Sequence, residues 1–290
     1  MNVLSLFDGI SCARVALDRV GLPVASYTAC EIEKNAIKVS TRNYPDIIRA
    51  GSVVGYVPGK VDLLIGGSPC QDLSIAKKGR KGLDGNRSCL FWEYLRIKKE
   101  SNPTWFVLEN VASMPKADRD TITREMGVEP IIINSCLVSA QSRKRLFWTN
   151  IPGVIQPKDR GILLRHILES TVDDKFNAKG VFSEKIGLGR GEIRTLGCIG
   201  NSHQANRVYD IDRKMATLCL GSSHYIQHDT IRKLTPVECE RLQSLPDGYT
   251  ECVATMHRYK CIGNAFNVDV VAHLLSYLLP TDGVKLKTDS

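Results

Sequence analysis

Residues 3–21 read Val-Leu-Ser-Leu-Phe-Asp-Gly-Ile-Ser-Cys-Ala-Arg-Val-Ala-Leu-Asp-Arg-Val-Gly, and this stretch decides the predicted fold. Its first five residues form an apolar run typical of a buried strand. From Cys12 onward apolar residues recur four positions apart, which predicts a helix with one apolar face that ends at Gly21. The turn between strand and helix is therefore expected at the carboxyl end of a strand, where open α/β sheets bind ligands.

Further strand-like runs follow within the first 150 residues, and helical patterns separate them. The runs are Val24–Cys30, Val61–Ile65, Trp105–Leu108, Ile131–Ile133 and Leu146–Trp148. Strands that alternate with helices are typical of a doubly wound, mainly parallel sheet. We therefore predict the α/β fold class, with residues 1–152 in the sheet domain.

The alternation stops after Pro152, where glycines and polar residues accompany only brief strand-like runs. We predict a smaller, loop-rich domain at residues 153–252. A turn at Gly263 and Asn264 precedes a last helical pattern from Val268 to Leu279, which returns residues 253–280 to the first domain. Residues 281–290 are polar and predict a flexible tail.

The composition limits the classes of function. Of the 290 residues, 43% are hydrophobic and 24% are charged, and no apolar run approaches the roughly 18 residues of a membrane span. The first residues lack the features of a signal peptide, so we expect a cytoplasmic protein with no membrane partner. The net charge of +8 suits a polyanionic partner.

Cysteine and histidine positions argue against a metal site. The ten cysteines are scattered without a CxxC pair, so we expect most of them to be reduced and buried. His224 and His228 lie four residues apart, but no helix and no further ligand is evident there, and an exposed or hydrogen-bonded pair is the favoured interpretation.

Candidate reactive residues follow several of the predicted strands. Cys70 comes after a predicted strand and the Gly66-Gly67-Ser68-Pro69 turn. Glu109 ends another predicted strand, Trp105–Leu108. Arg143 and Arg145, with Gln141, directly precede the last strand. Each alone is more often ordinary, since a lone cysteine is usually an inert buried thiol. The pattern predicts that they share one edge of the sheet but does not show that they converge.

Taken in order, these residues resemble the motifs of the cytosine-C5 DNA methyltransferase family over nearly all of residues 1–279. The motifs are Phe7-Asp8-Gly9, Glu31, Pro69-Cys70-Gln71, Glu109-Asn110-Val111, Gln141-Ser142-Arg143-Lys144-Arg145, residues 232–243 (RKLTPVECERLQ) and Gly263-Asn264. Residues 66–74 (GGSPCQDLS) and 147–150 (FWTN) further resemble the catalytic region of animal de novo methyltransferases, whose regulatory modules are missing here. The resemblance implies a stand-alone bacterial or phage type of enzyme, with a Rossmann-like class I methyltransferase fold and a target-recognition domain.

The resemblance also implies a mechanism on double-stranded DNA. Cys70 adds to carbon 6 of a flipped-out cytosine, Glu109 contacts ring nitrogen 3, and Arg143 and Arg145 steady the base and the nucleophile. Carbon 5 then takes a methyl group from S-adenosyl-L-methionine.

For this cofactor, Glu31 suits the ribose hydroxyls, Ile32 suits the adenine, and Asn264 with the turn around it closes the methionine end. The residues that the resemblance assigns to the cofactor are Phe7, Asp8, Gly9, Ile10, Glu31, Ile32, Ser52, Val53, Pro69, Asn264 and Ala265. Two positions depart from the family pattern. Ser52 stands where an acid often binds the adenine amino group, and Ser11-Cys12 stands where glycines are frequent.

A basic loop after Cys70 resembles the family's mobile loop that closes over DNA, and a glycine–serine run before residue 225 suggests a recognition loop. The residues expected to contact DNA are Gln71, Ser74, Lys77, Lys78, Arg80, Lys81, Arg87, Gly221, Ser222 and Ser223.

Two alternative functions are less favoured than DNA methylation. An RNA methyltransferase of the tRNA-methylating branch would carry a Cys-Phe-Thr signature, and an inactive relative would have lost Cys70 or Glu109. The pattern leaves the target sequence, a restriction partner and the choice between monomer and weak homo-oligomer open.

Overall fold

A seven-stranded sheet forms the centre of the computed structural model, which describes residues 1–69, 90–184, 191–200, 204–218, 225–227 and 230–279. The strand order is β3-β2-β1-β4-β5-β8-β6, and β8 alone runs antiparallel to its neighbours. The strands are β1 (Asn2–Leu6), β2 (Ser26–Cys30), β3 (Ile48–Gly51), β4 (Leu63–Gly67), β5 (Trp105–Val111), β6 (Ile131–Asn134) and β8 (Lys144–Thr149). The predicted doubly wound, mainly parallel α/β sheet is confirmed.

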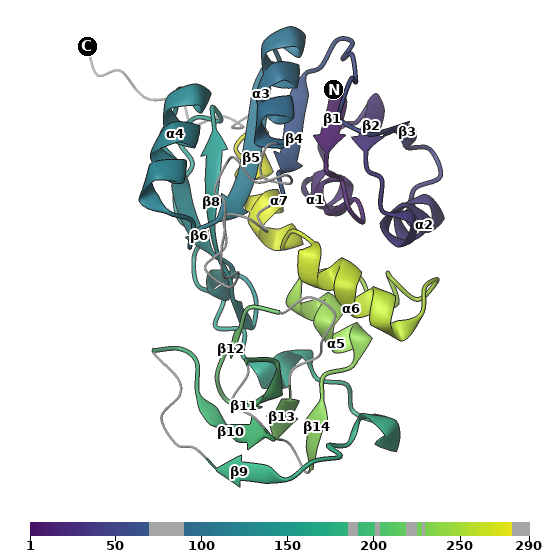
Figure 1. Ribbon diagram of the computed structural model, residues 1–290, viewed down its shortest axis with the longest axis vertical. Helices are drawn as coiled ribbons and strands as arrows, with labels where there is room; N and C mark the ends of the chain where they lie inside the picture. The colour runs from purple at the N-terminus through teal and green to yellow at the C-terminus, as the bar shows by residue number, and fades with distance from the viewer. Residues whose placement is uncertain (70–89, 185–190, 201–203, 219–224, 228–229, 280–290) are drawn as a thin grey trace, which may run out of the picture.

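Helices cover both faces of this sheet (Figure 1). They are α1 (Cys12–Val20), α2 (Lys34–Asn43), α3 (Leu90–Ser101), α4 (Lys116–Met126) and α7 (Val268–Ser276). Successive strand residues alternate between two buried clusters: Val3 packs with α1, α2 and α7, whereas Leu4 packs with α3 and α4. Side chains of a strand point to opposite faces in turn, so a strand covered on both sides becomes a continuous apolar run. This is why the runs were readable in the sequence.

The β1–α1 turn is built from backbone conformations that side chains seldom adopt. Phe7, Gly9 and Ser11 have φ of 57°, 59° and 61°, and the alternation turns the chain sharply from the strand into the helix. Strand β1 therefore ends at Leu6, one residue before the predicted end. Helix α1 runs from Cys12 to Val20 and ends at Gly21 with φ 72°, as predicted.

Several other elements differ from the prediction. Strand β5 continues to Val111, so Glu109 lies within the strand and not at its end. Strand β3 was missed because it is an edge strand and its Ile48 is 56% exposed, so it carries no buried run. Gly263 and Asn264 are the last residues of helix α6 (Thr255–Asn264) and do not form a turn. Helix α7 ends at Ser276 and not at Leu279, because the following residues bond three positions back and tighten out of the α-helix.

A smaller, five-stranded sheet lies beyond α5 (Pro236–Leu242) and α6 (Figure 1). Its strands, in the order β14-β13-β11-β10-β9, are β9 (Phe182–Glu184), β10 (Thr195–Ile199), β11 (Arg207–Asp210), β13 (Tyr225–Gln227) and β14 (Ile231–Lys233). A short parallel pair, β7 (Gln141–Ser142) with β12 (Met215–Ala216), joins the region before β8 to this second sheet. The division into domains at residues 152 and 252 stays a prediction.

Within the described residues, no helix has the length and apolar character needed to cross a membrane, and no group of three or more His, Cys, Asp and Glu side chains could hold a metal ion. All seven cysteines in these ranges are free, and six of them are buried.

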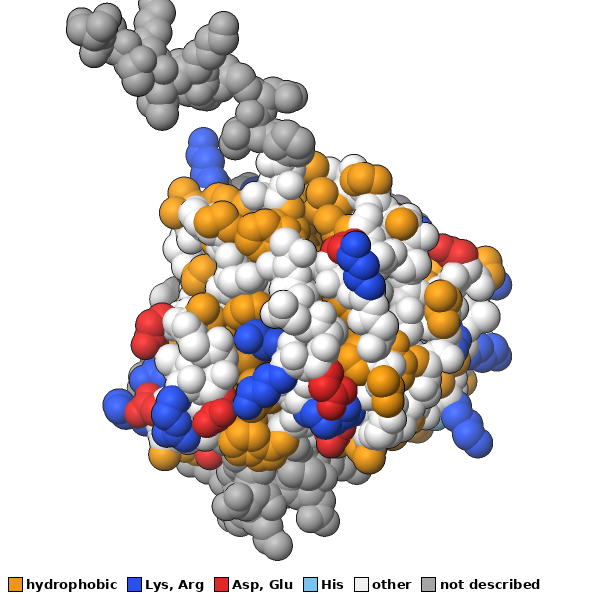
Figure 2. All heavy atoms as spheres, turned by 90° about the horizontal axis from the view of Figure 1, so that it is seen from above, with side chains coloured by type: hydrophobic (Ala, Val, Ile, Leu, Met, Phe, Trp, Pro, Cys, Tyr) orange, Lys and Arg blue, Asp and Glu red, His pale blue; other side chains and the backbone are white. Residues whose placement is uncertain are grey.

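Figure 2 views the molecule from the end where β1 begins, and its basic side chains there are interspersed with acidic and hydrophobic ones. His224, His228 and the tail at 281–290 lie outside the described residues.

Candidate active site

The β1–α1 turn is braced from the inside by Asp8. Its carboxyl group accepts hydrogen bonds from the Tyr27 hydroxyl (2.7 Å) and from the Ser11 hydroxyl. Asp8 is buried, and this burial raises the pKa of its carboxyl group above the ordinary value. Ile10 is 1% exposed and belongs to the core. Both side chains therefore support the turn from behind.

Glu31 is held at the end of β2 by backbone amides. Its carboxylate accepts hydrogen bonds from the N–H groups of Gly9, Ile32 and Glu33, each at 2.8 Å. These bonds tie the end of β2 to the Gly9 turn; Oε1 accepts two of them and Oε2 accepts one, so the remaining acceptor position is on Oε2. A fixed, half-buried carboxylate at this edge suits a donating hydroxyl.

Beyond Glu31 the surface is apolar. Ile32 is 72% exposed, and Val54, just after β3, is 62% exposed. Ser52 is exposed, and its hydroxyl accepts the Val54 N–H at 3.0 Å, whereas Val53 is buried in the core. Of the two predicted residues after β3, Ser52 alone is available to a ligand, and Val54 is an exposed neighbour that the sequence interpretation did not include.

The loop before Cys70 starts beside Glu109. Gly67, at the end of β4, pairs with Glu109 on β5. A Cβ atom on Gly67 would lie 2.7 Å from Phe266 Cε1 and 3.0 Å from Glu109 Oε2, so this close approach requires glycine. Ser68 is buried, and its hydroxyl accepts a hydrogen bond from the Asn110 amide at 3.1 Å.

The chain thus arrives at Pro69, the last described residue before Cys70, next to the acid. Cys70 and the ten predicted DNA-contacting residues lie outside the described residues, so their places in the site stay predictions. Those residues are Gln71, Ser74, Lys77, Lys78, Arg80, Lys81, Arg87, Gly221, Ser222 and Ser223.

Glu109 forms an ion pair with Arg145. Arg145 Nε lies 2.7 Å from Glu109 Oε1, and the two side chains are 16% and 13% exposed. Arg145 is the second residue of β8, which pairs antiparallel with β5, so it lies within the strand and not before it as predicted. The pair lines a small pocket with Phe266 and Ser135. Acid and arginine are therefore brought together on adjacent strands, close to open solvent.

Arg143 lines the same pocket, but its guanidinium group donates hydrogen bonds to backbone carbonyls. It is 6% exposed, and its Nη2 donates to the carbonyls of Gly263 (3.2 Å) and Ala265 (3.0 Å). These carbonyls belong to the end of α6 and the residues after it, where Asn264 and Ala265 are predicted to meet the cofactor. The two predicted arginines are thus near each other, but the ion pair to Glu109 is formed by Arg145.

Buried cysteines in the described ranges are poor nucleophiles. Burial raises the pKa of Cys30 to about 11, and burial raises the pKa of both Cys136 and Cys261 to about 12. Their thiols stay protonated near neutral pH, and a protonated thiol neither attacks nor binds metal well.

Two functional candidates were missed in the sequence. Phe266 packs against Gly67 and lines the pocket of Glu109, and Gln243 is fully buried between the two sheets. Phe266 directly follows the predicted Asn264-Ala265 pair, and Gln243 ends the motif at 232–243. A position directly after one recognised motif and the last position of another were the available signal.

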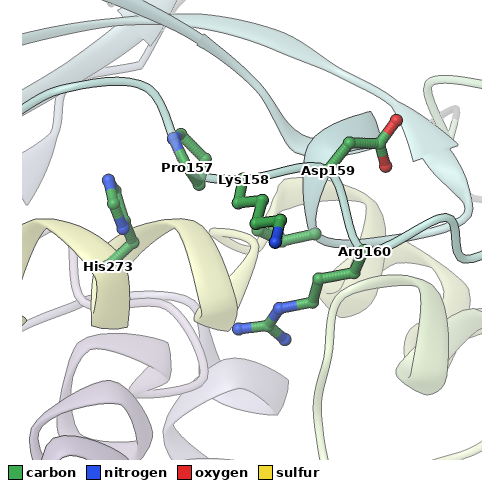
Figure 3. Close-up of a pocket in the computed structure, with 6 residues that line it drawn as sticks. Pro157, Lys158, Asp159, Arg160 and His273 are labelled. Carbon is green, nitrogen blue, oxygen red and sulfur yellow. The ribbon is translucent and has the colours of Figure 1, made fainter.

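A second hollow lies away from these residues, between the segment 157–160 and α7 (Figure 3). Its polar groups are largely engaged: Arg160 pairs with Asp269 at 2.7 Å, Asp159 lies 3.4 Å from the Lys214 ammonium, and the His273 Nε2 is 2.8 Å from the Ile155 carbonyl. None of the predicted site residues lines this hollow.

The fold is that of a doubly wound α/β protein, and the acid–arginine pair lies toward the carboxyl edge of its sheet, where folds of this class bind ligands. The model of the C-5 cytosine-specific DNA methylase family matches residues 1–153 and 183–279, and the chain belongs to this family. The family defines the chain as a cytosine-C5 DNA methyltransferase and implies methylation that uses S-adenosylmethionine. The predicted family is confirmed.

Bacterial relatives match most of the chain. It is 28% identical to the type II methyltransferase M1.ScrFI of Lactococcus lactis subsp. cremoris, over 96% of this chain and 78% of the relative. It is 26% identical to the type II methyltransferase M.HpaII of Haemophilus parainfluenzae, over 92% and 86%. A shorter match, 37% identical over 41% of this chain and 24% of the relative, links it to the orphan methyltransferase M.Rho11sI of Bacillus phage rho11s.

Solved structures share the fold. The S. pombe Dnmt2 methyltransferase superposes with a TM-score of 0.71 at 18% identity, covering 96% of this chain and 98% of that one. The Entamoeba histolytica methyltransferase EhMeth gives 0.71 at 15% identity, covering 96% and 97%. The likeness extends over nearly the whole chain and supports the assigned fold.

Proposed function

We propose that the chain transfers a methyl group from S-adenosyl-L-methionine to carbon 5 of a cytosine flipped out of double-stranded DNA, through a covalent adduct of Cys70 at carbon 6. One observation carries the proposal. The Glu109–Arg145 pair lies beside Gly67, the last residue of β4, from which the chain leads through Pro69 into Cys70. Acid and nucleophile thereby start from neighbouring strands.

In this proposal each residue moves or holds a defined group. The Cys70 thiolate forms a bond to carbon 6, and the displaced ring electrons make carbon 5 nucleophilic. Glu109 faces nitrogen 3 and holds the proton that neutralises the ring, while Arg145 fixes the direction of the Glu109 carboxylate. After methylation, the proton on carbon 5 passes to water, the electrons of that bond reform the double bond as the bond from Cys70 to carbon 6 breaks, and the proton on nitrogen 3 returns to Glu109. Arg143 supports the neighbouring turn.

The cofactor residues have suitable chemistry. Glu31 has an acceptor position left on Oε2 for a ribose hydroxyl, and the exposed Ile32 offers an apolar surface to a purine. Phe266 packs beside Glu109 at the residues where the methionine end is expected. When bound there, S-adenosylmethionine supplies an electrophilic methyl group.

DNA binding completes the proposal. The net charge of +8 favours a polyanion, and the stacked duplex hides carbon 6, so the target cytosine must leave the stack. We assign target recognition to residues 153–252 and the basic loop after Cys70 to phosphate contacts. We place the enzyme in the cytoplasm of a prokaryotic or phage-infected cell.

Transfer of radiolabelled methyl groups tests this function. The purified chain is expected to label duplex DNA, and Cys70→Ala is expected to lower the rate at least about 10³-fold because the nucleophile is lost. Cys252→Ala, which changes a partly exposed cysteine elsewhere, is the matched control and keeps the rate. Labelling of tRNA without labelling of DNA would overturn the proposal.

A further inference from the structure

Two glutamine side chains are completely buried between the large sheet and the small sheet. Gln141 lies in β7, and Gln243 follows helix α5; both are 0% exposed. A buried amide that lacks partners is costly, so the bonds of both residues define their role.

The two amides form one continuous chain of hydrogen bonds. The Leu218 N–H donates to Gln141 Oε1 (2.8 Å), and Gln141 Nε2 donates to Gln243 Oε1 (3.2 Å). Gln243 Nε2 then donates to the carbonyls of Ile262 (2.9 Å) and Ala265 (3.2 Å). A backbone N–H can only donate and a carbonyl can only accept, so the two ends fix the orientation of both amides. Bonds aligned in one direction strengthen one another.

The first end of this chain belongs to the small-sheet side. Leu218 follows β12 and packs in a cluster with Tyr209 of β11 and Ile226 of β13. Its neighbour Thr217 donates from its hydroxyl to the Ser142 carbonyl at 2.8 Å. A displacement of the small sheet is therefore transmitted to β7 and to Gln141.

The second end belongs to the cofactor side of the site. The Ala265 carbonyl receives both Gln243 and Arg143, and the next residue, Phe266, packs against Gly67 in the pocket of Glu109. The position of this carbonyl sets the backbone that carries Asn264 and Phe266. Gln243 thus bonds to Gln141 on the small-sheet side and to the Ala265 carbonyl on the cofactor side.

We propose that Gln243 is a positioning residue that couples DNA bound by the small-sheet side to cofactor bound at residues 264–266. The inference rests on the proposed function, because it assigns DNA to one end and S-adenosylmethionine to the other. Binding at either end orders the same hydrogen-bond chain, so each ligand tightens the binding of the other by the same factor.

Gln243→Met is the variant that cuts this chain with the least damage. Methionine keeps the length and volume of the side chain. Gln141 Nε2 still has the Leu242 carbonyl at 3.3 Å, and the Ala265 carbonyl keeps Arg143. Ser139→Ala is the matched control: Ser139 is also buried and donates to the Leu242 carbonyl, but it lies outside the path to Ala265.

The measurement is the affinity for S-adenosylhomocysteine, by titration calorimetry, with and without a duplex that carries the target site. Bisulfite sequencing of DNA methylated by the enzyme first identifies this site. We expect the duplex to tighten binding about 10-fold in the wild type and in Ser139→Ala, and less than about 2-fold in Gln243→Met. Affinity without DNA should change little in Gln243→Met, whereas a merely structural role would lower it and leave the coupling factor intact.

An unchanged coupling factor in Gln243→Met would overturn the inference, as would a wild type that binds both ligands without coupling. A wild type that binds neither ligand would instead overturn the proposed function. If Gln243→Met fails to fold by circular dichroism, Gln243→Asn, whose shorter amide cannot span the same partners, is measured against the same two outcomes.

Discussion

Polar side chains at the carboxyl edge of the large sheet differ in exposure from those at the junction between the two sheets, which is formed by Gln141, Gln243 and Arg143. At the edge, Glu109 and Arg145 pair across two strands and remain partly exposed. At the junction, Gln141, Gln243 and Arg143 are almost completely buried and bond to one another's segments or to backbone carbonyls. Polar groups left near solvent are available to a substrate, whereas those enclosed in a complete network hold the fold. One motif, residues 141–145, supplies both regions.

The strongest test of this contrast is Glu109→Gln. The amide keeps the shape of the side chain but can no longer exchange a proton as the carboxyl group does, so kcat is expected to fall by about 10²–10⁴-fold. The melting temperature should change little, because the residue lies at the open edge. Single-turnover methylation and thermal unfolding provide the two readouts. The same change at the exposed Glu129 serves as control, and equal rates in both variants would remove Glu109 from the reaction.

Substitution of the two arginines of the motif, Arg143 and Arg145, should lower the free energy of unfolding by different amounts. Arg143→Ala is expected to lower the free energy of unfolding by about 2–4 kcal/mol, because two backbone carbonyls lose a buried charged donor. Arg145→Ala is expected to cost less, about 1–2 kcal/mol, because its ion pair is less buried than Arg143, while slowing methyl transfer. Urea unfolding measures both values. If the two variants lose equal stability, the division between edge and junction is wrong.

Asp8 offers a test by pH. Burial raises the pKa of Asp8, so the native state holds its proton at a pH where the unfolded chain has released it. The stability that this group contributes is complete below the ordinary pKa of 3.8 and is lost as pH rises through the native pKa. Asp8→Asn cannot titrate.

The wild type should therefore lose stability relative to Asp8→Asn as pH rises above the ordinary pKa of 3.8. Urea unfolding of both proteins across this range checks the sign. A difference that stays constant, or that grows in favour of the wild type, would contradict the buried, proton-holding carboxyl.

The smallest effect is expected at Ile32. Because the side chain is 72% exposed, Ile32→Ser should change the free energy of unfolding by less than about 0.5 kcal/mol. The KM for S-adenosylmethionine should rise about 3–10-fold through lost apolar contact. Ile155→Ser, at a 68% exposed position elsewhere, should leave KM unchanged. An unaltered KM in Ile32→Ser would remove this residue from the cofactor site.

The sequence predicted the large sheet well because its central strands are covered on both faces and appear as apolar runs. Strand β3 escaped because its outer edge is solvated and its Ile48 is exposed. A turn was predicted at Gly263 and Asn264 because these residues favour turns, and helix α6 itself was missed; in the structure they end α6, where Arg143 and Gln243 hold backbone carbonyls.

Within the site, the order of the motifs identified Glu109 and Arg145 but could not give the direction of each side chain. Asp8 adjoins a glycine turn and could have faced either a ligand or the core; Tyr27 and Ser11, its hydrogen-bond partners, direct it inward. The role of Gln243 depends on Gln141, which lies about a hundred residues earlier in the chain. Such long-range pairings depend on the fold and are not visible in local spacing.

The most direct test of the proposed active site is covalent trapping on duplex DNA with 5-fluorocytosine at the target. Fluorine cannot leave carbon 5 as a proton does, so the adduct with Cys70 should persist after methyl transfer. Intact mass spectrometry is expected to show a wild-type protein–DNA complex and none with Cys70→Ser. A complex that forms equally well with Cys70→Ser would contradict the central claim.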